Sequence, residues 1–246
     1  MDYLLGLDDT DDHSSRGTGY RARQLGRWLQ FQGLARVNSI TRHQLSAAEG
    51  IPKTSKNSAA CLHLWLNIGD MDRLQSCLIK FLSMVAAPTA QPGVCLAPAG
   101  SVAITVQRFG RICKEGVVEL TEAIKRAEAA SMWLATTDDL GSGRIGAMAA
   151  VGLRASGEDG RYIWLPELRS LKGVTSVMEL SSQCGIDVVC SPDGAQAAPM
   201  DRIRLNSWIR PLLRAGQPRV LVESVEGRDE YEWKLLDKGR VKQLDK

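Results

Sequence analysis

Four aspartates fall within five positions near the start of the chain, at Asp8, Asp9, Asp11 and Asp12. Like charges packed this closely repel one another, and a hard divalent cation such as Mg²⁺ relieves the repulsion. The apolar run at residues 3–7 predicts a buried strand that leads into the aspartates. A helix predicted at 17–33 follows, and its free N–H groups suit anionic oxygen atoms. The pattern predicts a site for a metal-bound polyphosphate, although solvated, aspartate-rich helix caps have the same composition.

A second polar loop, at residues 46–58, carries two lysines together with hydroxyl and amide groups. Lys53, Thr54 and Asn57 are candidates to face a phosphate or a substrate, with Lys53 as the point charge. An ordinary surface turn has the same composition. The loop alone therefore does not decide between a binding role and a structural one.

A third loop begins the small-residue stretch at 141–152, where three glycines fall within six positions. A glycine loop that opens onto a helix brings backbone N–H groups close to a phosphate, and an arginine adds positive charge. The candidates here are Gly141, Gly143, Arg144 and Gly146. The spacing fits neither the Walker nor the dinucleotide-binding pattern, and tight packing of a helix against a sheet favours the same residues.

The composition limits the class of protein. The chain has 246 residues, 44% hydrophobic and 24% charged, which suits one large or two small globular domains. A net charge of +3 is too small to predict a nucleic-acid partner by itself. The six cysteines lack Cys-x-x-Cys spacing, so a zinc site is not expected. Without a signal peptide or a membrane-spanning run, we expect a cytoplasmic protein with reduced thiols and no membrane partner.

Hydrophobic periodicity predicts a mixed series of strands and helices. Beyond 3–7, strands are expected at 37–42, 61–68, 101–106, 162–168 and 186–190. Helices are expected at 17–33, 71–85 (behind an Asp70 cap), 115–134, 173–183 and 201–213. Other expectations are an irregular stretch at 86–100, a closing hairpin of 220–225 with 231–236, and a frayed tail over the last ten residues.

The loops, taken in order, resemble the motifs of the archaeal tRNA-isoleucine agmatinylcytidine synthetases. Residues 6–11 read Gly-Leu-Asp-Asp-Thr-Asp, similar to that family's Gly-Ile-Asp-Asp-Thr-Asp, and Thr18 and Tyr20 follow. Residues 52–59 resemble its Lys-Thr-Arg-Gly-Asn-Gly-Ala loop, and 91–93 resemble its Asn-Pro-Gly. The glycine loop is similar to its Gly-Arg-Gly-Leu-Ile-Gly-Ala-Leu-Ala-Ala-Ile-Gly segment.

The resemblance implies an α/β (α+β) fold in which a discontinuous kinase-like α/β domain is interleaved with a ferredoxin-like domain. The kinase-like domain would comprise 1–58 and 135–192, and the ferredoxin-like domain 59–134 and 193–246. In that family ATP activates a cytidine of tRNA so that agmatine can displace an oxygen. The cofactors implied are ATP and Mg²⁺.

Residue roles follow from the same resemblance. The metal ligands would be Asp8, Asp9 and Asp11. The catalytic residues would be Asp8, Asp9, Lys53 and the phosphoryl-handling Thr18. The nucleotide would be held by Thr10, Asp12, Thr54, Asn57, Gly141, Gly143, Arg144 and Gly146. His13 is a less favoured candidate base, since a lone loop histidine more often has no catalytic role.

The chain also departs from the family pattern. Ser55, Lys56 and Ser58 replace the arginine and both glycines of the second loop, and Ser142 stands where an arginine is expected. The OB-fold and zinc modules that grip tRNA in that family have no counterpart. ATP chemistry is therefore better supported than a tRNA substrate.

We expect a Mg²⁺-dependent, ATP-using transferase or ligase of kinase-like type. Its acceptor would be a small molecule activated by phosphoryl or nucleotidyl transfer, for example in cofactor biosynthesis. One alternative is a tRNA-modifying enzyme similar to the agmatinylcytidine synthetases, with a partner chain that docks the RNA. Another is a non-catalytic nucleotide-binding or scaffold protein. ATP turnover would separate a catalyst from a binder, and co-purifying tRNA would separate the two enzymes.

Overall fold

The structure is a computed structural model of the chain. It describes residues 1–49, 51, 57–66, 69, 71–138, 140–225 and 230–245. The chain divides into two compact units, Met1–Ser156 and Gly157–Lys246, and each is described by itself. The predicted mixed α/β class is confirmed, since helices and strands occur in both units. In the part of the chain that the structure describes, no helix is both long and apolar enough to cross a bilayer.

The first unit begins with the element order β-α-β-β-α-β. The elements are β1 (Asp2–Asp8), α1 (Thr18–Phe31), β2 (Ala35–Gln44), β3 (Ser58–Leu66), α2 (Met71–Val85) and β4 (Gly93–Pro98). The strands lie in the order β4-β1-β3-β2, and β5 (Trp133–Thr136) extends the sheet beside β4. All neighbours are antiparallel. This is the connectivity of ferredoxin-like folds.

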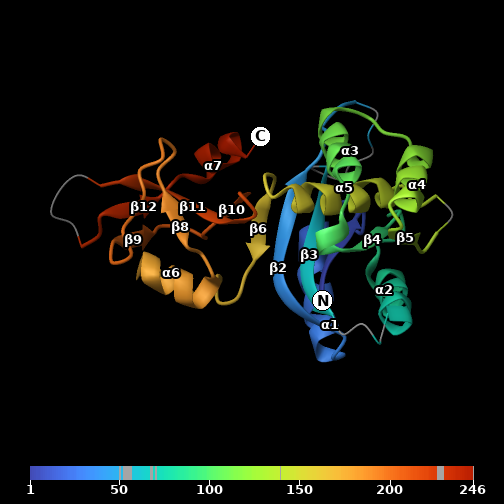
Figure 1. The fold of residues 1–246 in the computed structure, drawn as a ribbon, viewed down its shortest axis with the longest axis horizontal. Coiled ribbons are helices and arrows are strands. Elements are labelled where there is room, and N and C mark those ends of the chain that lie inside the picture. Colours follow the sequence, from blue (N-terminus) through green and yellow to red (C-terminus); the bar gives the residue numbers. More distant parts are fainter. Residues whose placement is uncertain are drawn as a thin grey trace. The chain divides into compact units, whose positions relative to one another are not determined.

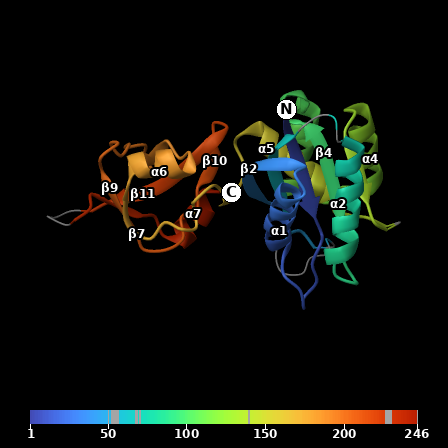
Figure 2. The same cartoon turned by 90° about the horizontal axis from the view of Figure 1, so that it is seen from below.

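Helices cover both faces of this sheet (Figure 1). On one face α1 packs through Leu25 and Leu29, both fully buried, and α2 lies beside it, with Trp28 and Phe81 in ring contact at 5.5 Å. On the other face lie α3 (Ile104–Glu115), α4 (Leu120–Ala129) and α5 (Gly143–Ser156). Figure 2 shows α1 and α2 from below. The sheet is therefore the middle of three layers, and its apolar strands are buried on both faces.

The helix α5 lies unusually close to β1. A methyl group on Gly6 of β1 would overlap the carbonyl of Ala147 in α5. A methyl group on Gly93 of β4 would likewise overlap the backbone of Gly143. Glycine has no Cβ, so it alone permits this approach of backbone to backbone. The glycines of three separate sequence motifs thus share one packing role.

Three predictions for the first unit are wrong. Residues 101–106 are not a strand, because Val106, Phe109, Gly110 and Cys113 are buried at the helical spacing of α3. The long helix predicted at 115–134 is the shorter α4, which ends before Ser131 takes a left-handed φ of 52°, and β5 follows. The supposedly irregular stretch 86–100 contains β4, preceded by a proline and ended by another.

The second unit combines parallel and antiparallel strand pairs with helices. Its elements are β6 (Arg161–Trp164), β7 (Gly173–Ser176), α6 (Val177–Cys184), β8 (Val188–Cys190), β9 (Arg202–Leu205), β10 (Leu212–Arg214), β11 (Gln217–Ser224), β12 (Trp233–Leu235) and α7 (Lys238–Leu244). The strand order is β6-β10-β11-β12-β9-β7, and β8 pairs in parallel with β11. Its core includes Leu180, Ile203, Val220 and Val222. The predicted hairpin is confirmed as antiparallel β11 and β12.

The predicted helix at 201–213 is wrong. Arg202 and Arg204 are exposed while Ile203 between them is buried, which is the period of a strand, and β9 forms there. Pro211 stands just before β10. Proline cannot donate the hydrogen bond that a helix requires, so a continuous helix is disfavoured.

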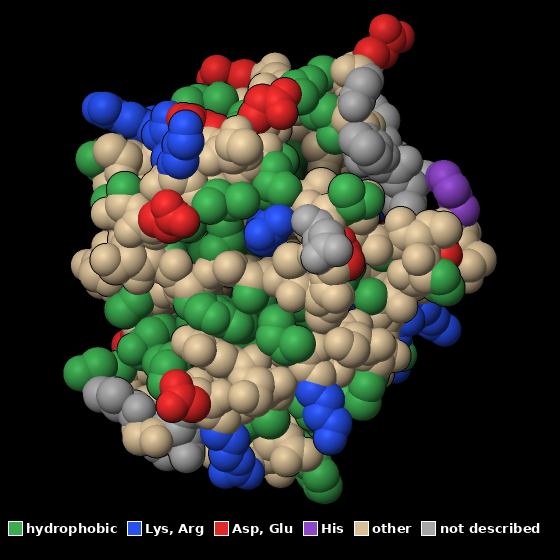
Figure 3. All heavy atoms as spheres, turned by 90° about the vertical axis from the view of Figure 1, so that its right-hand side faces the viewer, with side chains coloured by type: hydrophobic (Ala, Val, Ile, Leu, Met, Phe, Trp, Pro, Cys, Tyr) green, Lys and Arg blue, Asp and Glu red, His purple; other side chains and the backbone are tan. Residues whose placement is uncertain are grey.

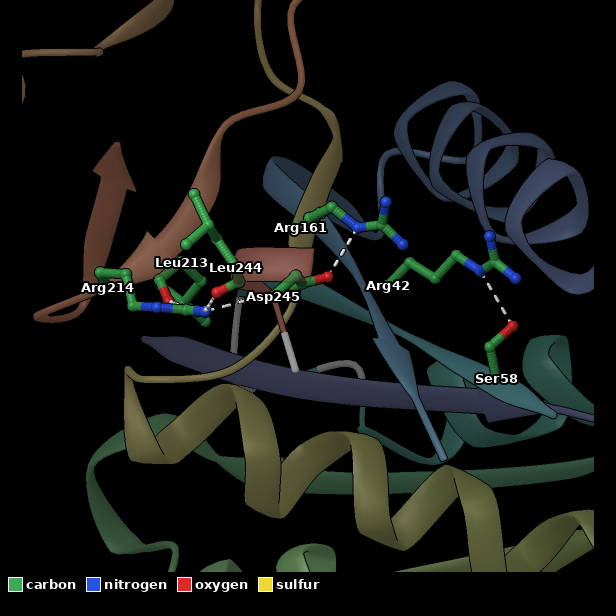
Figure 4. Close-up of polar contacts among 7 residues, drawn as sticks. All are labelled: Arg42, Ser58, Arg161, Leu213, Arg214, Leu244 and Asp245. Carbon is green, nitrogen blue, oxygen red and sulfur yellow. Dashed lines mark hydrogen bonds and ion pairs between the residues drawn. The ribbon is translucent and has the colours of Figure 1, made fainter. Parts of the chain in front are cut away.

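The predicted frayed tail is also wrong, because α7 is anchored at both ends. Asp237 accepts a hydrogen bond from the Gly239 N–H at 2.6 Å. At the other end, the Asp245 carboxylate lies 2.7 Å from Arg161 Nε and 3.8 Å from Arg214, and Arg214 donates to the Leu244 carbonyl at 3.1 Å. Figure 4 shows the contacts of Asp245 and Leu244, and also the bond from Arg42 to Ser58 that joins β2 to β3 in the first unit.

The first compact unit contains segments that the predicted boundaries assign to two different domains. Residues 59–134 lie in the same unit as 1–58, because β3 and β4 flank β1 in one sheet. The assignment of a kinase-like domain to 1–58 and 135–192 stays a prediction, as does a ferredoxin-like domain at 59–134 and 193–246.

Replacing Gly6 with alanine should destabilise the protein strongly. The added methyl group would have to displace the backbone of α5, so we expect the free energy of unfolding to fall by about 3 kcal/mol or more. The matched control is Gly116→Ala, where a methyl group would meet no atom within 4 Å. Urea unfolding measures both. Equal stability of the two variants would contradict the close approach of β1 and α5.

Candidate functional site

The first two aspartates lie where β1 ends beside the start of α5. Asp8 is the last residue of β1, and its carboxylate rests on Gly146, where a methyl group would overlap it. Asp9 follows with a left-handed φ of 49°, a conformation that aspartate tolerates better than most residues. The missing Cβ of Gly143 would lie 2.9 Å from Asp9 Cβ. Two of the three predicted metal ligands are thus held against the same helix.

Hydrogen bonds through Gln91 link Asp9 to the glycine loop. The Gln91 N–H donates to Asp9 Oδ2 at 3.2 Å, and the Gln91 carbonyl accepts from the Gly143 N–H at 2.9 Å. The Gln-Pro-Gly motif therefore joins the first motif to the third. The resemblance pointed to this motif, but it assigned Gln91 no role.

Asp11 fixes the start of α1. Its Oδ1 accepts hydrogen bonds from the Thr18 N–H at 2.8 Å and from the Thr18 hydroxyl at 2.7 Å. Thr10, fully buried, donates its hydroxyl to Thr18 Oγ1 at 3.4 Å. Asp11 acts as a cap for a helix whose N-cap residue, Gly17, has no side chain to do so. Hydrogen bonds therefore bring Thr10, Asp11 and Thr18 together.

Asp12 and His13 lie on the outer part of the loop. Asp12 Oδ1 accepts from the Ser14 N–H at 2.9 Å and from the Ser14 hydroxyl at 2.8 Å. The Ser14 hydroxyl lowers the pKa of Asp12, helped by bonds from Ser15. These local bonds give Asp12 a turn-forming role, and its predicted contact with the nucleotide stays a prediction. His13 is exposed.

The glycine loop is held by a carboxylate that the sequence analysis did not single out. Asp138 Oδ1 accepts from the Gly141 N–H at 2.6 Å, and Asp138 also raises the pKa of Asp9 electrostatically. Thr136, at the end of β5, donates its hydroxyl to the Pro92 carbonyl at 2.7 Å. The signal in the sequence that could have identified Asp138 is its position between an apolar run and the glycines.

Of the remaining predicted site residues, Arg144 and Asn57 make local hydrogen bonds. Arg144 Nε donates to the Gly141 carbonyl at 3.0 Å, so the guanidinium is anchored on the loop itself. Asn57 donates to the Ser46 carbonyl at 2.9 Å and so closes the second loop. Lys53 and Thr54 lie outside the described residues. Their roles, and those of Arg144 and Asn57 toward a nucleotide, stay predictions.

Burial and mutual repulsion make the site electrostatically unfavourable for bare carboxylates. Loss of hydration raises the pKa of Asp8 to about 7, and the charges of Asp9 and Asp11 add to the rise against a lowering bond from the Asp9 backbone. Burial also raises the pKa of Asp9, opposed by the Gln91 N–H and reinforced by Asp11 and Asp138. A cation placed between these carboxylates would relieve the repulsion and favour their ionised forms.

The site carboxylates fit a metal ion that is also coordinated by the phosphates of a bound nucleotide. Among the described residues, no group of three or more His, Cys, Asp or Glu side chains is gathered as a metal cage. The predicted trio of Asp8, Asp9 and Asp11 is therefore not preformed, since Asp11 is turned to Thr18. Mg²⁺ is usually bound by one or two carboxylates, water and substrate phosphates. Asp8 and Asp9 fit that arrangement.

No protein-family model matches this sequence, and no curated protein matches it either. Solved structures do resemble the fold. They include a structure titled "tRNA fluorescent labeling enzyme" (24% identity, TM-score 0.55), apo TiaS, a tRNA agmatidine synthetase (21%, 0.54), and TiaS in complex with its tRNA and ATP (24%, 0.55). Each match covers 62% of this chain but only 35–36% of the other chain. The likeness supports the predicted resemblance at the level of the fold and agrees with the predicted α+β class.

Replacing Asp8 with asparagine should change how stability depends on pH. Folded wild-type protein keeps a proton on Asp8 that the unfolded chain releases above about pH 4. Its free energy of unfolding should therefore fall as the pH rises from about 4 to about 7. The variant should lack this fall and be more stable above pH 7 by about 1–4 kcal/mol. Urea unfolding from about pH 5 to 8, in EDTA, measures both.

The matched control is Asp12→Asn, because hydrogen bonds lower rather than raise the pKa of Asp12. That variant should keep the fall in stability between pH 4 and pH 7. If Asp8→Asn showed the wild-type profile instead, Asp8 would not be the destabilised carboxylate.

Proposed function

We propose that the first unit binds Mg²⁺–ATP where β1 ends beside α5, and that the chain uses ATP to modify RNA. The observation that carries this proposal is the position of Asp8 and Asp9 against the first turn of α5. Two carboxylates with raised pKa values recruit a divalent cation, and the cation in turn recruits phosphate oxygens.

The start of α5 is suited to an anion bound beside that cation. The helix is 14 residues long and begins in a glycine turn, so the positive end of its dipole faces the site. Its first turn contains Gly143 and Gly146, whose lack of a side chain lets Asp9 and Asp8 lie directly against the helix. Mg²⁺ would supply charge neutralisation for the phosphates, and Arg144 and Lys53 would add to it.

Thr18 is the candidate for handling a phosphoryl group. Its hydroxyl hydrogen points to Asp11, 2.7 Å away, so a carboxylate orients the hydroxyl and is placed to accept its proton. The oxygen of Thr18 also accepts from Thr10, which restricts it further. Thr10 and Asp11 would therefore act as positioning residues for Thr18, and Thr54, Asn57 and Asp12 would contact the nucleotide.

RNA is favoured over a small-molecule acceptor by the fold comparisons. Two of the similar structures are of a tRNA agmatidine synthetase, one of them with tRNA and ATP bound, and a third is titled as a tRNA labeling enzyme. The small-molecule acceptor remains the competing candidate and is included in the experiment below. A nucleotide-binding protein without turnover is the third outcome.

Neutralising the site carboxylates should weaken binding of Mg²⁺–ATP. We expect Asp8→Asn and Asp9→Asn each to raise the dissociation constant at least about tenfold, which corresponds to about 1.4 kcal/mol for one lost charged ligand. Asp72→Asn, an exposed carboxylate of the same unit on α2, is the matched control and should bind like wild type. Isothermal titration with a non-hydrolysable ATP analogue, with and without Mg²⁺, measures this.

Turnover then separates the three candidates. ATP labelled at the α or the γ phosphate is incubated with the protein and either an unmodified tRNA transcript or a panel of amines and hydroxylated metabolites. ATP cleavage that requires tRNA supports the proposal, and cleavage that requires only a small molecule replaces it with the competing enzyme. Binding without turnover indicates a non-catalytic protein, and absence of Mg²⁺–ATP binding by wild type refutes the site altogether.

A further inference from the structure

The segment that directly follows the aspartates carries basic residues and no acidic ones. Residues 13–48 contain six arginines, at 16, 21, 23, 27, 36 and 42, and no Asp or Glu. The net charge of +3 conceals this, because acidic residues elsewhere balance it. On the face that Figure 3 shows, Lys and Arg side chains are interspersed with acidic and apolar ones. The basic segment includes the whole of α1.

Part of this charge lies along the solvent side of α1. Arg16 precedes the helix, and Tyr20, Arg23 and Arg27 follow at spacings of four, three and four residues, which place them along one side of a helix. We call these four residues the α1 stripe. The buried residues of α1, such as Ala22, lie on the opposite side. Tyr20 and Arg27 are about 10 Å apart along the helix axis.

The α1 stripe combines cations with an accessible aromatic ring. Tyr20 is 40% exposed. The guanidinium of Arg16 lies 4.9 Å from the centre of its ring, and those of Arg21 and Arg23 each lie 5.9 Å from it. Three positive charges thus surround one tyrosine. Arginine and an exposed aromatic ring are the groups that hold the phosphates and bases of unpaired nucleic acid.

Three arginines of this segment lack a neutralising carboxylate among the described residues. No ion pair in that part of the chain joins Arg16, Arg21 or Arg27 to an acidic side chain. The buried Nε of Arg21 has no hydrogen-bond partner there either. Like charges held together without counter-charges favour a polyanionic ligand, because such a ligand relieves their repulsion.

The α1 stripe starts at the candidate site and leads away from it. Thr18, in the first turn of α1, is bonded to Asp11, so Arg16 and Tyr20 lie beside the site residues in sequence and on the same helix end. A nucleotide held by Asp8 and Asp9 could reach this first turn. Arg27 lies two turns further on, which suits a chain of successive phosphates rather than one triphosphate.

We propose that the α1 stripe binds an unpaired RNA segment and leads it to the site at the end of β1. The arginines contact successive phosphates, and Tyr20 stacks on a base. This inference rests on the proposed function for its direction toward the site, but the binding surface is testable without catalysis.

The test measures RNA binding by the full chain with fluorescence anisotropy. The probe is a fluorescein-labelled, unstructured RNA of about 20 nucleotides, titrated at several salt concentrations. We expect Arg16→Ala/Arg27→Ala to weaken binding at least about tenfold and to lower the slope of log K against log salt by about 2. The matched control is Arg108→Ala/Arg111→Ala, two exposed arginines on α3, which should bind within about twofold of wild type.

Tyr20 tests the stacking contact separately. Tyr20→Ala should weaken RNA binding about five- to a hundredfold, with the salt slope unchanged, and Tyr20→Phe should restore it. Circular dichroism on the same samples confirms that the variants are folded.

Two outcomes overturn the RNA surface: wild type that fails to bind the RNA, or an Arg16→Ala/Arg27→Ala variant that binds as tightly as the control pair. Titration of the same samples with Mg²⁺ and the ATP analogue keeps the two proposals apart. RNA binding that depends on the α1 stripe, without nucleotide binding by wild type, refutes the proposed function and leaves the RNA surface standing. The reverse result refutes the RNA surface and leaves the nucleotide site standing.

Discussion

The first unit depends on backbone-to-backbone contact between α5 and the strands β1 and β4. Gly6 against Ala147 and Gly93 against Gly143 allow an approach that any side chain would block, and Gly146 makes room for the Asp8 carboxylate. Because these glycines belong to three motifs far apart in sequence, one packing event gathers all three. Dispersion contacts over such a closely fitted surface are numerous, so a small displacement of α5 would be felt along the whole sheet.

The same packing explains the electrostatics of the site. Pressing Asp8 against a helix removes water from its carboxylate, and Asp9, Asp11 and Asp138 add like charge, so the bare site is costly to ionise. Energetically unfavourable features of this kind are found at sites where binding of a ligand offsets them. The left-handed backbone of Asp9 is a further unfavourable feature at the site. Positive φ also occurs away from the site, at Glu167 and Ala215.

The sequence predicted some elements of the fold correctly and others wrongly, for physical reasons. The strand at residues 3–7, helix α1 and the glycine loop have strong local signals, and all three are present. The predictions for residues 101–106 and 201–213 were wrong because short apolar runs fit both the helical and the strand period. Tertiary contacts stabilise a helix in the first segment and strands in the second. Asp138 could not be assigned, because its bond to Gly141 depends on where β5 joins the sheet. Lys53 lies outside the described residues.

The Asp11 carboxylate accepts two hydrogen bonds from Thr18 and is also a candidate metal ligand. The two roles compete for the same oxygen atoms. A cation that drew Asp11 inward would have to release the first turn of α1, and anything that tightened that turn would hold Asp11 back. Binding of a cation by Asp11 and the order of the helix start would then be thermodynamically linked, equally in both directions.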